Sequence, residues 1–197
     1  ETSSFRSSIQ WVHDYEIVLE KGFSGIKKEA VERLHALDED SAVDTLEKKP
    51  FLEAVILTCD AIVLWANRHA DLAEQLAEKE KDEKTRQELY TIAKNARRAE
   101  FPPENFYQAL QSQWFVQMFS RIEQKTGTVI SNGRMDQYLY PYYKKDIENG
   151  TLTKAQAQEL LECMWVEMSE FVDLYLSETG GAFNEGYAHW EAVTIGG

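Results

Sequence analysis

Histidines are the side chains of this sequence best suited to acid–base or metal chemistry, and there are four: His13, His35, His69 and His189. Their spacing matches no metal-binding motif. His35 and His69 fall within regular helical patterns, which indicates structural roles. His13 and His189 stand among aromatic residues, in Trp11-Val-His-Asp-Tyr15 and Tyr187-Ala-His-Trp190, where each could line a pocket. Aromatic core packing, with the imidazole bonded to a nearby carboxylate, explains the same pattern and is the simpler interpretation.

A second group of polar side chains, Ser131-Asn-Gly-Arg-Met-Asp136, combines a turn with an arginine and an aspartate two positions apart. Arginine offers a planar fork of donors that suits a carboxylate or several carbonyls. We therefore expect a structural ion pair between Arg134 and Asp136 that orders the loop, in preference to a catalytic role.

Other chemical signals are few. The sequence contains no Gly-rich phosphate loop, no HExxH, no CxxC and no nucleophile elbow. Its two cysteines, Cys59 and Cys163, lie far apart inside apolar helical patterns. They are predicted to be buried free thiols in a reducing compartment, and neither a disulfide nor a metal site.

The composition is that of a folded, acidic protein. The 197 residues are 43% hydrophobic and 12% aromatic, which is enough for a sizeable core, and they carry a net charge of −13. This charge argues against a nucleic-acid backbone or an anionic membrane surface as partner, since both attract clustered Lys and Arg. No apolar run is expected to reach the length that spans a bilayer.

The elements that must position these side chains are mostly helices. A helical pattern begins at Tyr15 and is interrupted at Gly22 and Gly25. A long helix is predicted from Phe51 to about Glu80, followed by a charged turn and a second helix. The prolines of Phe101-Pro-Pro-Glu104 end that helix and start another, which is apolar around most of its circumference. Thr153-Lys-Ala-Gln156 has capping-box spacing and predicts the start of a last helix that extends to Tyr175.

Strands are expected only near the ends, with a loop or short strand at Thr126 to Gly133. The terminal Asn184–Gly197 is aromatic and β-branched and closes on a glycine pair. A strand placed there needs neighbours for its amides, and none lies nearby in sequence. We therefore expect 1–197 to be part of a larger fold.

Several segments resemble one family. Ser131-Asn-Gly-Arg-Met-Asp-Gln-Tyr-Leu-Tyr-Pro-Tyr-Tyr-Lys-Lys-Asp146 resembles the (S/P)-G-R-x-D-Q-Y-x-Y-P-Y-Y-x-x-D stretch of glycyl radical enzymes, the pyruvate formate-lyase-like proteins. The helical segments Phe101–Trp114 and Leu152–Trp165, the entry Asp14–Ile26 and the terminal Thr194-Ile-Gly-Gly197 also match that family, in order and across nearly the whole chain.

The resemblance implies an α/β fold, in which this chain is the mostly helical portion of a ten-stranded α/β barrel, incomplete within 1–197. It also implies an anaerobic radical lyase, dehydratase or decarboxylase that acts on a small organic substrate. In such enzymes a protein-based glycyl radical oxidises a cysteine at the barrel centre, inside a closed, dry cavity. Neither the thiyl-cysteine loop nor the C-terminal glycyl loop is found in these residues, so the chain alone is expected to be inactive, with no metal or organic cofactor.

The same resemblance implies which residues line the substrate pocket. Trp190 and, less directly, Phe183 match aromatics beside the substrate, and Ser131 and Asn132 precede Gly133-Arg134 where dehydratases place a partner for a substrate hydroxyl. His13 is a further candidate, and Ile9-Gln-Trp-Val-His13 departs from the Gly-His of polyol dehydratases. The family further implies a radical SAM activating enzyme, a homodimer and a cytoplasmic location. A helical binding or scaffold domain without chemistry remains the alternative that explains the amphipathic helices.

Overall fold

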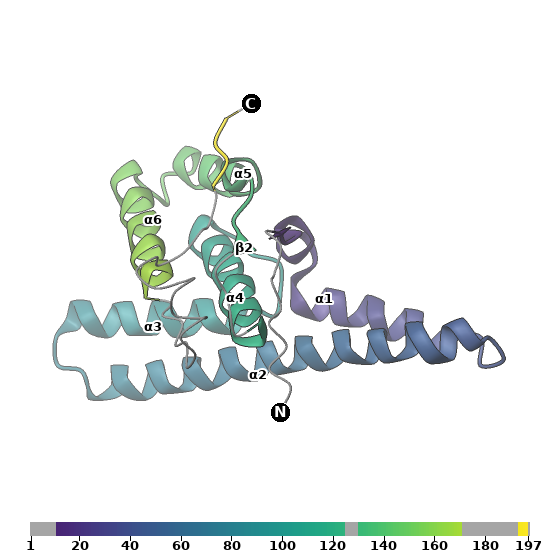
Figure 1. The fold of residues 1–197 in the computed structure, drawn as a ribbon. Coiled ribbons are helices and arrows are strands. Elements are labelled where there is room, and N and C mark those ends of the chain that lie inside the picture. The colour runs from purple at the N-terminus through teal and green to yellow at the C-terminus, as the bar shows by residue number, and fades with distance from the viewer. Residues whose placement is uncertain (1–10, 125–129, 171–192, 197) are drawn as a thin grey trace, which may run out of the picture. The chain divides into compact units, whose positions relative to one another are not determined.

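The computed structural model describes residues 11–124, 130–170 and 193–196, and these residues are mostly helical (Figure 1). The elements in chain order are β1 (Trp11–Val12), α1 (Tyr15–His35), the π-helical turn η1 (Asp44–Lys48), α2 (Lys49–Lys79), α3 (Glu83–Arg98), α4 (Phe106–Gln124), β2 (Ile130–Ser131), α5 (Met135–Glu148) and α6 (Lys154–Ser169). The helices predicted from the apolar spacing begin within a few residues of their expected starts, and the predicted end of the last one at Tyr175 lies outside the described residues.

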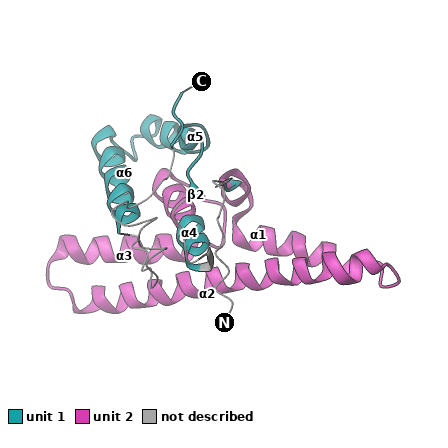
Figure 2. Ribbon diagram, viewed as in Figure 1, with its two compact units in different colours: residues 1–14, 116–197 teal, residues 15–115 magenta. Residues whose placement is uncertain are grey.

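The chain divides into two compact units, coloured separately in Figure 2. One unit consists of residues 15–115, which hold α1 to α3 and the first half of α4. The other consists of residues 1–14 and 116–197. This latter part, unit 1 in Figure 2, therefore includes residues from the two ends of the chain and contains both described strands.

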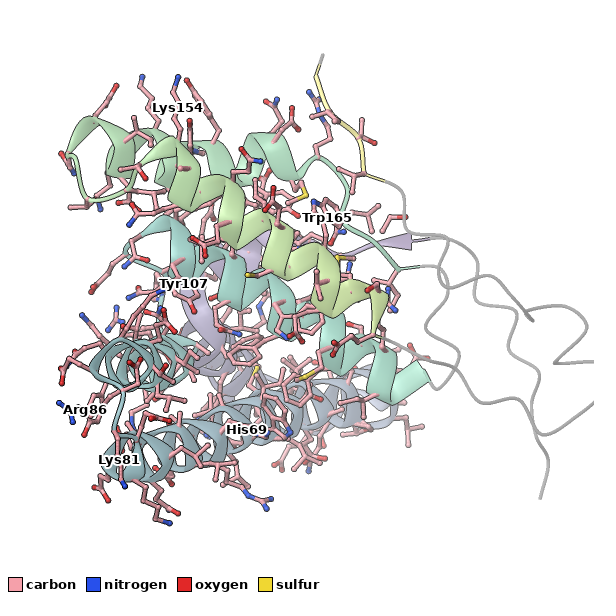
Figure 3. The ribbon with its side chains drawn as sticks, turned by 90° about the vertical axis from the view of Figure 1, so that its left-hand side faces the viewer. His69, Lys81, Arg86, Tyr107, Lys154 and Trp165 are labelled. Carbon is pink, nitrogen blue, oxygen red and sulfur yellow. The ribbon has the colours of Figure 1, made fainter. Side chains whose placement is uncertain are left out.

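Within residues 15–115, unit 2 in Figure 2, α2 and α3 lie side by side as a helical hairpin (Figure 1). Their facing sides consist of alanines, which let the two backbones approach closely: Ala66, Ala70, Ala73 and Ala77 on α2, and Ala93 and Ala96 on α3, all buried. The predicted charged turn joins them. Asp82 caps α3 by accepting from the Thr85 N–H at 2.9 Å. Lys81 in the turn and Arg86 at the start of α3 lie at this end of the hairpin (Figure 3).

Helix α1 is kinked at Gly22, as its sequence predicted, whereas Gly25 is helical. Gly22 has φ +64°, and a Cβ on it would lie 2.5 Å from the carbonyl oxygen of Glu100. The neighbouring Ser24 N–H donates to that same oxygen at 2.9 Å. The kink thus exists because the loop after α3 lies directly against the backbone of α1.

Helix α4 begins after the two prolines, as expected. Asn105 Oδ1 accepts from the Gln108 N–H at 3.0 Å, and Gln108 Oε1 accepts from the Glu104 N–H at 2.9 Å. This reciprocal pairing satisfies donors that a helix start otherwise leaves open.

One helical stretch, Asp44–Lys79, is long and apolar enough to cross a membrane by length and composition. This corrects the expectation that no apolar run reaches that length. Apolar side chains lie on more than one side of this helix, since Leu57 and Leu64 are exposed while Leu52 is buried. A core helix of a soluble protein passes the same test.

In unit 1, α6 begins with the predicted capping box. Thr153 Oγ1 accepts from the Gln156 N–H at 3.2 Å, and Gln156 Oε1 accepts from the Thr153 N–H at 2.9 Å. Its buried side is formed by Ala157, Met164 and Met168. Lys154 and Trp165, labelled in Figure 3, lie near the start and toward the end of this helix, and Trp165 is 41% exposed.

Candidate functional site

Parallel strand pairing brings together three segments that are far apart in sequence. β1 pairs with β2 in parallel, with Trp11 opposite Ile130 and Val12 opposite Ser131. A further parallel bridge joins Gly133 to Val193, and the Thr194 N–H donates to the Gly133 carbonyl oxygen at 3.1 Å. The terminal strand therefore has a partner, which lies sixty positions earlier. Parallel strands joined through helices are the arrangement that builds an α/β barrel wall.

Alternation along β2 sends its side chains to opposite sides. Ile130 and Asn132 share one side and are fully buried. Ser131 shares the other side with its register partner Val12. Val12 is 56% exposed in this chain. The two polar residues that were predicted together as pocket lining, Ser131 and Asn132, thus point in opposite directions.

The side chain of Asn132 is held among helices. Its Oδ1 accepts from Gln117 Nε2 of α4 at 2.9 Å, and its Nδ2 donates to the Met168 sulfur of α6 at 3.5 Å. Its backbone carbonyl accepts from the Tyr138 hydroxyl of α5 at 2.7 Å. Asn132 therefore anchors the strand to three helices, whereas Ser131, which is also buried (6% exposed), projects from the opposite side of the strand.

Gln117 was missed by the sequence analysis. It is completely buried, as is most of the helix around it, and it donates to both Asn132 and the carbonyl oxygen of Ile130, the latter at 3.2 Å. Arg121, one turn later, donates from Nε to Gln117 Oε1 at 3.5 Å. A signal was present: Gln113, Gln117 and Arg121 recur every four residues on a helix that apolar residues surround on most of its circumference. Polar side chains so placed need partners inside the protein.

Arg134 and Asp136 meet at the terminal strand. Asp136 Oδ2 accepts from the Gly196 N–H at 2.9 Å, and an Arg134 guanidinium nitrogen donates to the Gly196 carbonyl oxygen at 3.0 Å. Among the ion pairs of the described residues, none joins Arg134 directly to Asp136. Both side chains instead bind the backbone of the same residue, Gly196. The Gly196 N–H lowers the pKa of Asp136, followed by the hydrogen bond from Gln137 and the positive charge of Arg134.

Gly133 sits at the centre of this arrangement. Its φ is +61°, and a Cβ on it would lie 2.6 Å from a methyl group of Val12. Only glycine fits both the backbone conformation and the contact. His13 follows Val12, is partly buried, and has a pKa lowered from its usual value by desolvation. The neutral imidazole is therefore favoured at neutral pH.

The other residues named from the sequence differ in what the structure describes of them. Trp190, Phe183 and His189 lie outside the described residues. His69 has a local role, since its ring stacks on Trp65 at 3.6 Å between centroids and its Nδ1 lies 3.0 Å from the Trp65 carbonyl oxygen. Ile195 is 78% exposed, whereas strand alternation would put it on the same side as Val193, the residue that bridges to Gly133.

The cysteines differ from each other. Cys59 is buried in α2, and burial raises the pKa of its thiol. Cys163 is exposed, which corrects the expectation that both are buried. Its position on α6 falls about a third of a turn from the buried line of Ala157, Met164 and Met168, because successive helical residues are about 100° apart.

Comparison with known proteins gives one consistent family. The family model described as pyruvate formate lyase-like matches residues 1–197. An isethionate sulfite-lyase of Desulfovibrio desulfuricans is 68% identical over 198 aligned positions, which cover 100% of this chain and 24% of that protein. A trans-4-hydroxy-L-proline dehydratase of Clostridioides difficile is 40% identical over 77% of this chain and 19% of that protein.

Among solved structures, the glycerol-bound B12-independent glycerol dehydratase from Clostridium butyricum superposes with a TM-score of 0.85 at 34% identity. The match covers 93% of this chain and 23% of that one. The chain thus spans about a quarter of the length of the proteins it matches, and it has the fold of the mostly helical portion of their α/β barrel.

Proposed function

Because this chain belongs to the pyruvate formate lyase-like family of glycyl radical enzymes, we propose that the complete protein is a radical carbon–sulfur lyase that releases sulfite from isethionate. One observation carries the proposal: the chain is 68% identical over its whole length to an isethionate sulfite-lyase, against 40% over three quarters of its length to a dehydratase of the same family.

The proposed reaction balances without an external oxidant. Isethionate is 2-hydroxyethanesulfonate, and loss of hydrogensulfite by C–S cleavage leaves acetaldehyde. A hydrogen leaves the carbon that bears the hydroxyl and is returned to the carbon that loses sulfur, so no net redox change occurs. The radical supplies this hydrogen abstraction. The cysteine and the glycine that carry it are proposed to lie outside 1–197, so these residues by themselves have no turnover.

Within this chain, the proposed contribution to the pocket comes from the side of β1 and β2 opposite to the one that Ile130 and Asn132 occupy. Ser131 lies on that side, and its hydroxyl can donate to or accept from a substrate oxygen. Trp190 is proposed to follow Ser131 along the wall, with Phe183 and His13 as further candidates. Apolar and aromatic walls exclude water, which a reaction through a thiyl radical requires.

The family also suggests the partners of the complete protein. A radical SAM activating enzyme would generate the glycyl radical, and the enzyme would act as a cytoplasmic homodimer in anaerobic cells. The radical is part of the polypeptide, and no metal or organic cofactor is proposed for residues 1–197.

The test uses the complete protein, activated anaerobically by its activating enzyme, with the glycyl radical quantified by electron paramagnetic resonance. We expect isethionate to give sulfite and acetaldehyde in equal amounts. Glycerol and trans-4-hydroxy-L-proline, offered in parallel, should give no turnover. A radical-loaded enzyme that releases no sulfite but dehydrates either of the other substrates would overturn the proposal.

A further inference from the structure

The fully buried side chain of Gln117 forms hydrogen bonds to groups outside its own helix. Its amide nitrogen reaches across from α4 to two groups of the β2 segment, the Ile130 carbonyl oxygen at 3.2 Å and Asn132 Oδ1 at 2.9 Å. Its amide oxygen accepts from Arg121 at 3.5 Å. Both donor hydrogens and the acceptor are thus used, which a buried amide requires to be stable.

These contacts lie on both sides of Ser131. Ile130, which precedes it, is held at its carbonyl oxygen by Gln117. Asn132, which follows it, is held at its side chain by Gln117 and Met168, and at its carbonyl oxygen by Tyr138. Peptide units are planar, so only the dihedral angles between the two fixed units are left to vary. The direction in which Ser131 projects is therefore set from the opposite side of the strand.

We propose that Gln117 is a positioning residue for the reaction, and that it acts by fixing the direction of the Ser131 hydroxyl toward the substrate. The proposal rests on the proposed function for the identity of the substrate. Gln117 itself touches neither substrate nor radical, since it lies on the helix side of β2. Its effect is geometric, and a displacement of about 1 Å in a substrate-positioning group can reduce a rate by about 100-fold.

A double-mutant cycle in the complete, activated enzyme tests this route of action. Gln117→Met keeps the length of the side chain and removes its hydrogen bonds, and Ser131→Ala removes the hydroxyl. We expect Gln117→Met to reduce sulfite release per glycyl radical by about 10- to 100-fold. In the Ser131→Ala background the same change should cost less than about 3-fold, because residues that act through one another are not additive. Equal losses in both backgrounds, or no loss from Gln117→Met alone, would overturn the proposal.

A matched control separates positioning from general destabilisation. Gln108 is also a buried glutamine of α4, but its side chain bonds to the Glu104 N–H at the helix start. Gln108→Met should lower the thermal unfolding midpoint and leave sulfite release per radical within about 3-fold of wild type, because it removes a comparable buried bond away from β2. If Gln117→Met does not fold, Gln117→Glu takes its place, since it keeps the acceptor for Arg121 and loses the donor to Ile130 and Asn132.

A crystal structure of the complete Gln117 variant tests the geometry independently of turnover. We expect the Ser131 side chain to change direction or lose its single conformation, while α4 stays in place. If the wild-type enzyme fails to release sulfite, the proposed substrate is wrong, and this structure still decides the role of Gln117. An unchanged Ser131 in the variant would overturn that role whatever the substrate.

Discussion

The carboxylate of Asp136 accepts a hydrogen bond from the backbone N–H of Gly196 at 2.9 Å, across sixty positions of the sequence. Arg134 donates to the carbonyl oxygen of the same glycine at 3.0 Å. Together with the bridge between Gly133 and Val193, these bonds attach the terminal strand to the segment after β2. Arg134 and Asp136 therefore hold a neighbouring strand by its backbone, and we call these two side chains the Gly196 clamp.

We predict that removing either side chain of the Gly196 clamp frees the terminal strand. Asp136→Ala and Arg134→Ala in the complete protein should each accelerate amide hydrogen exchange at Gly196 by about tenfold, the order expected when a charge-assisted hydrogen bond is lost. Lys144→Ala serves as the control. Lys144 is an exposed residue of α5, the helix that also contains Asp136, and its substitution should leave exchange at Gly196 unchanged. Wild-type exchange in both clamp variants would show that the clamp does not hold the strand.

The Gly196 clamp should weaken only in acid. Hydrogen bonding from Gly196 holds the pKa of Asp136 below its ordinary value of 3.8. A carboxyl with a lower pKa in the folded state stabilises that state above the unfolded value, and this contribution is lost as the pH falls through the folded value. The difference in unfolding free energy between wild type and Asp136→Ala should be constant above about pH 5 and shrink below 3.8. A difference that persists unchanged at pH 2 would contradict the assignment.

Gly133→Ala should be far more harmful than Gly150→Ala. Both glycines have positive φ, +61° and +69°, but only Gly133 has a neighbour, the Val12 methyl at 2.6 Å from the added Cβ. Backbone strain costs about 1 kcal/mol at each site, and overpacking at Gly133 should add about 1–3 kcal/mol. Chemical denaturation of the complete proteins measures both. Val12→Ala in the Gly133→Ala background should recover part of the loss, and failure to recover any would argue against the Val12 contact as the cause.

Trp190→Ala in the complete enzyme should reduce sulfite release per radical by about 10- to 100-fold, with a smaller effect on folding. The reason is the proposed alternation: a strand through these positions would put Trp190 on the same side as Ala192 and Thr194, and an aromatic on the inner side of a barrel shapes the cavity. Trp190→Phe should retain most of the activity, because it keeps an aromatic wall. Turnover and KM equal to wild type in Trp190→Ala would place this side chain outside the cavity.

Local structure was largely determined by the sequence itself. The capping box at Thr153, the break at the prolines after Phe101 and the kink at Gly22 depend on dihedral preferences and on hydrogen bonds that reach only a few residues. The family was also readable from the sequence, because motifs of several residues in a fixed order are rarely matched by chance. These predictions are confirmed by the structure and by the comparisons.

Tertiary structure alone decided which way the site residues point and what they hold. The sequence grouped Ser131 with Asn132 as pocket lining, but the pairing of β1 with β2 and the packing of three helices on one side separated them. The sequence predicted a pair between Arg134 and Asp136, but in the structure both side chains form hydrogen bonds with the backbone of Gly196. The same long-range contacts gave the buried Gln117 its role. Side-chain periodicity indicates that a residue is buried. Its hydrogen-bond partner depends on chain segments that folding brings together, here from sixty positions away in the sequence.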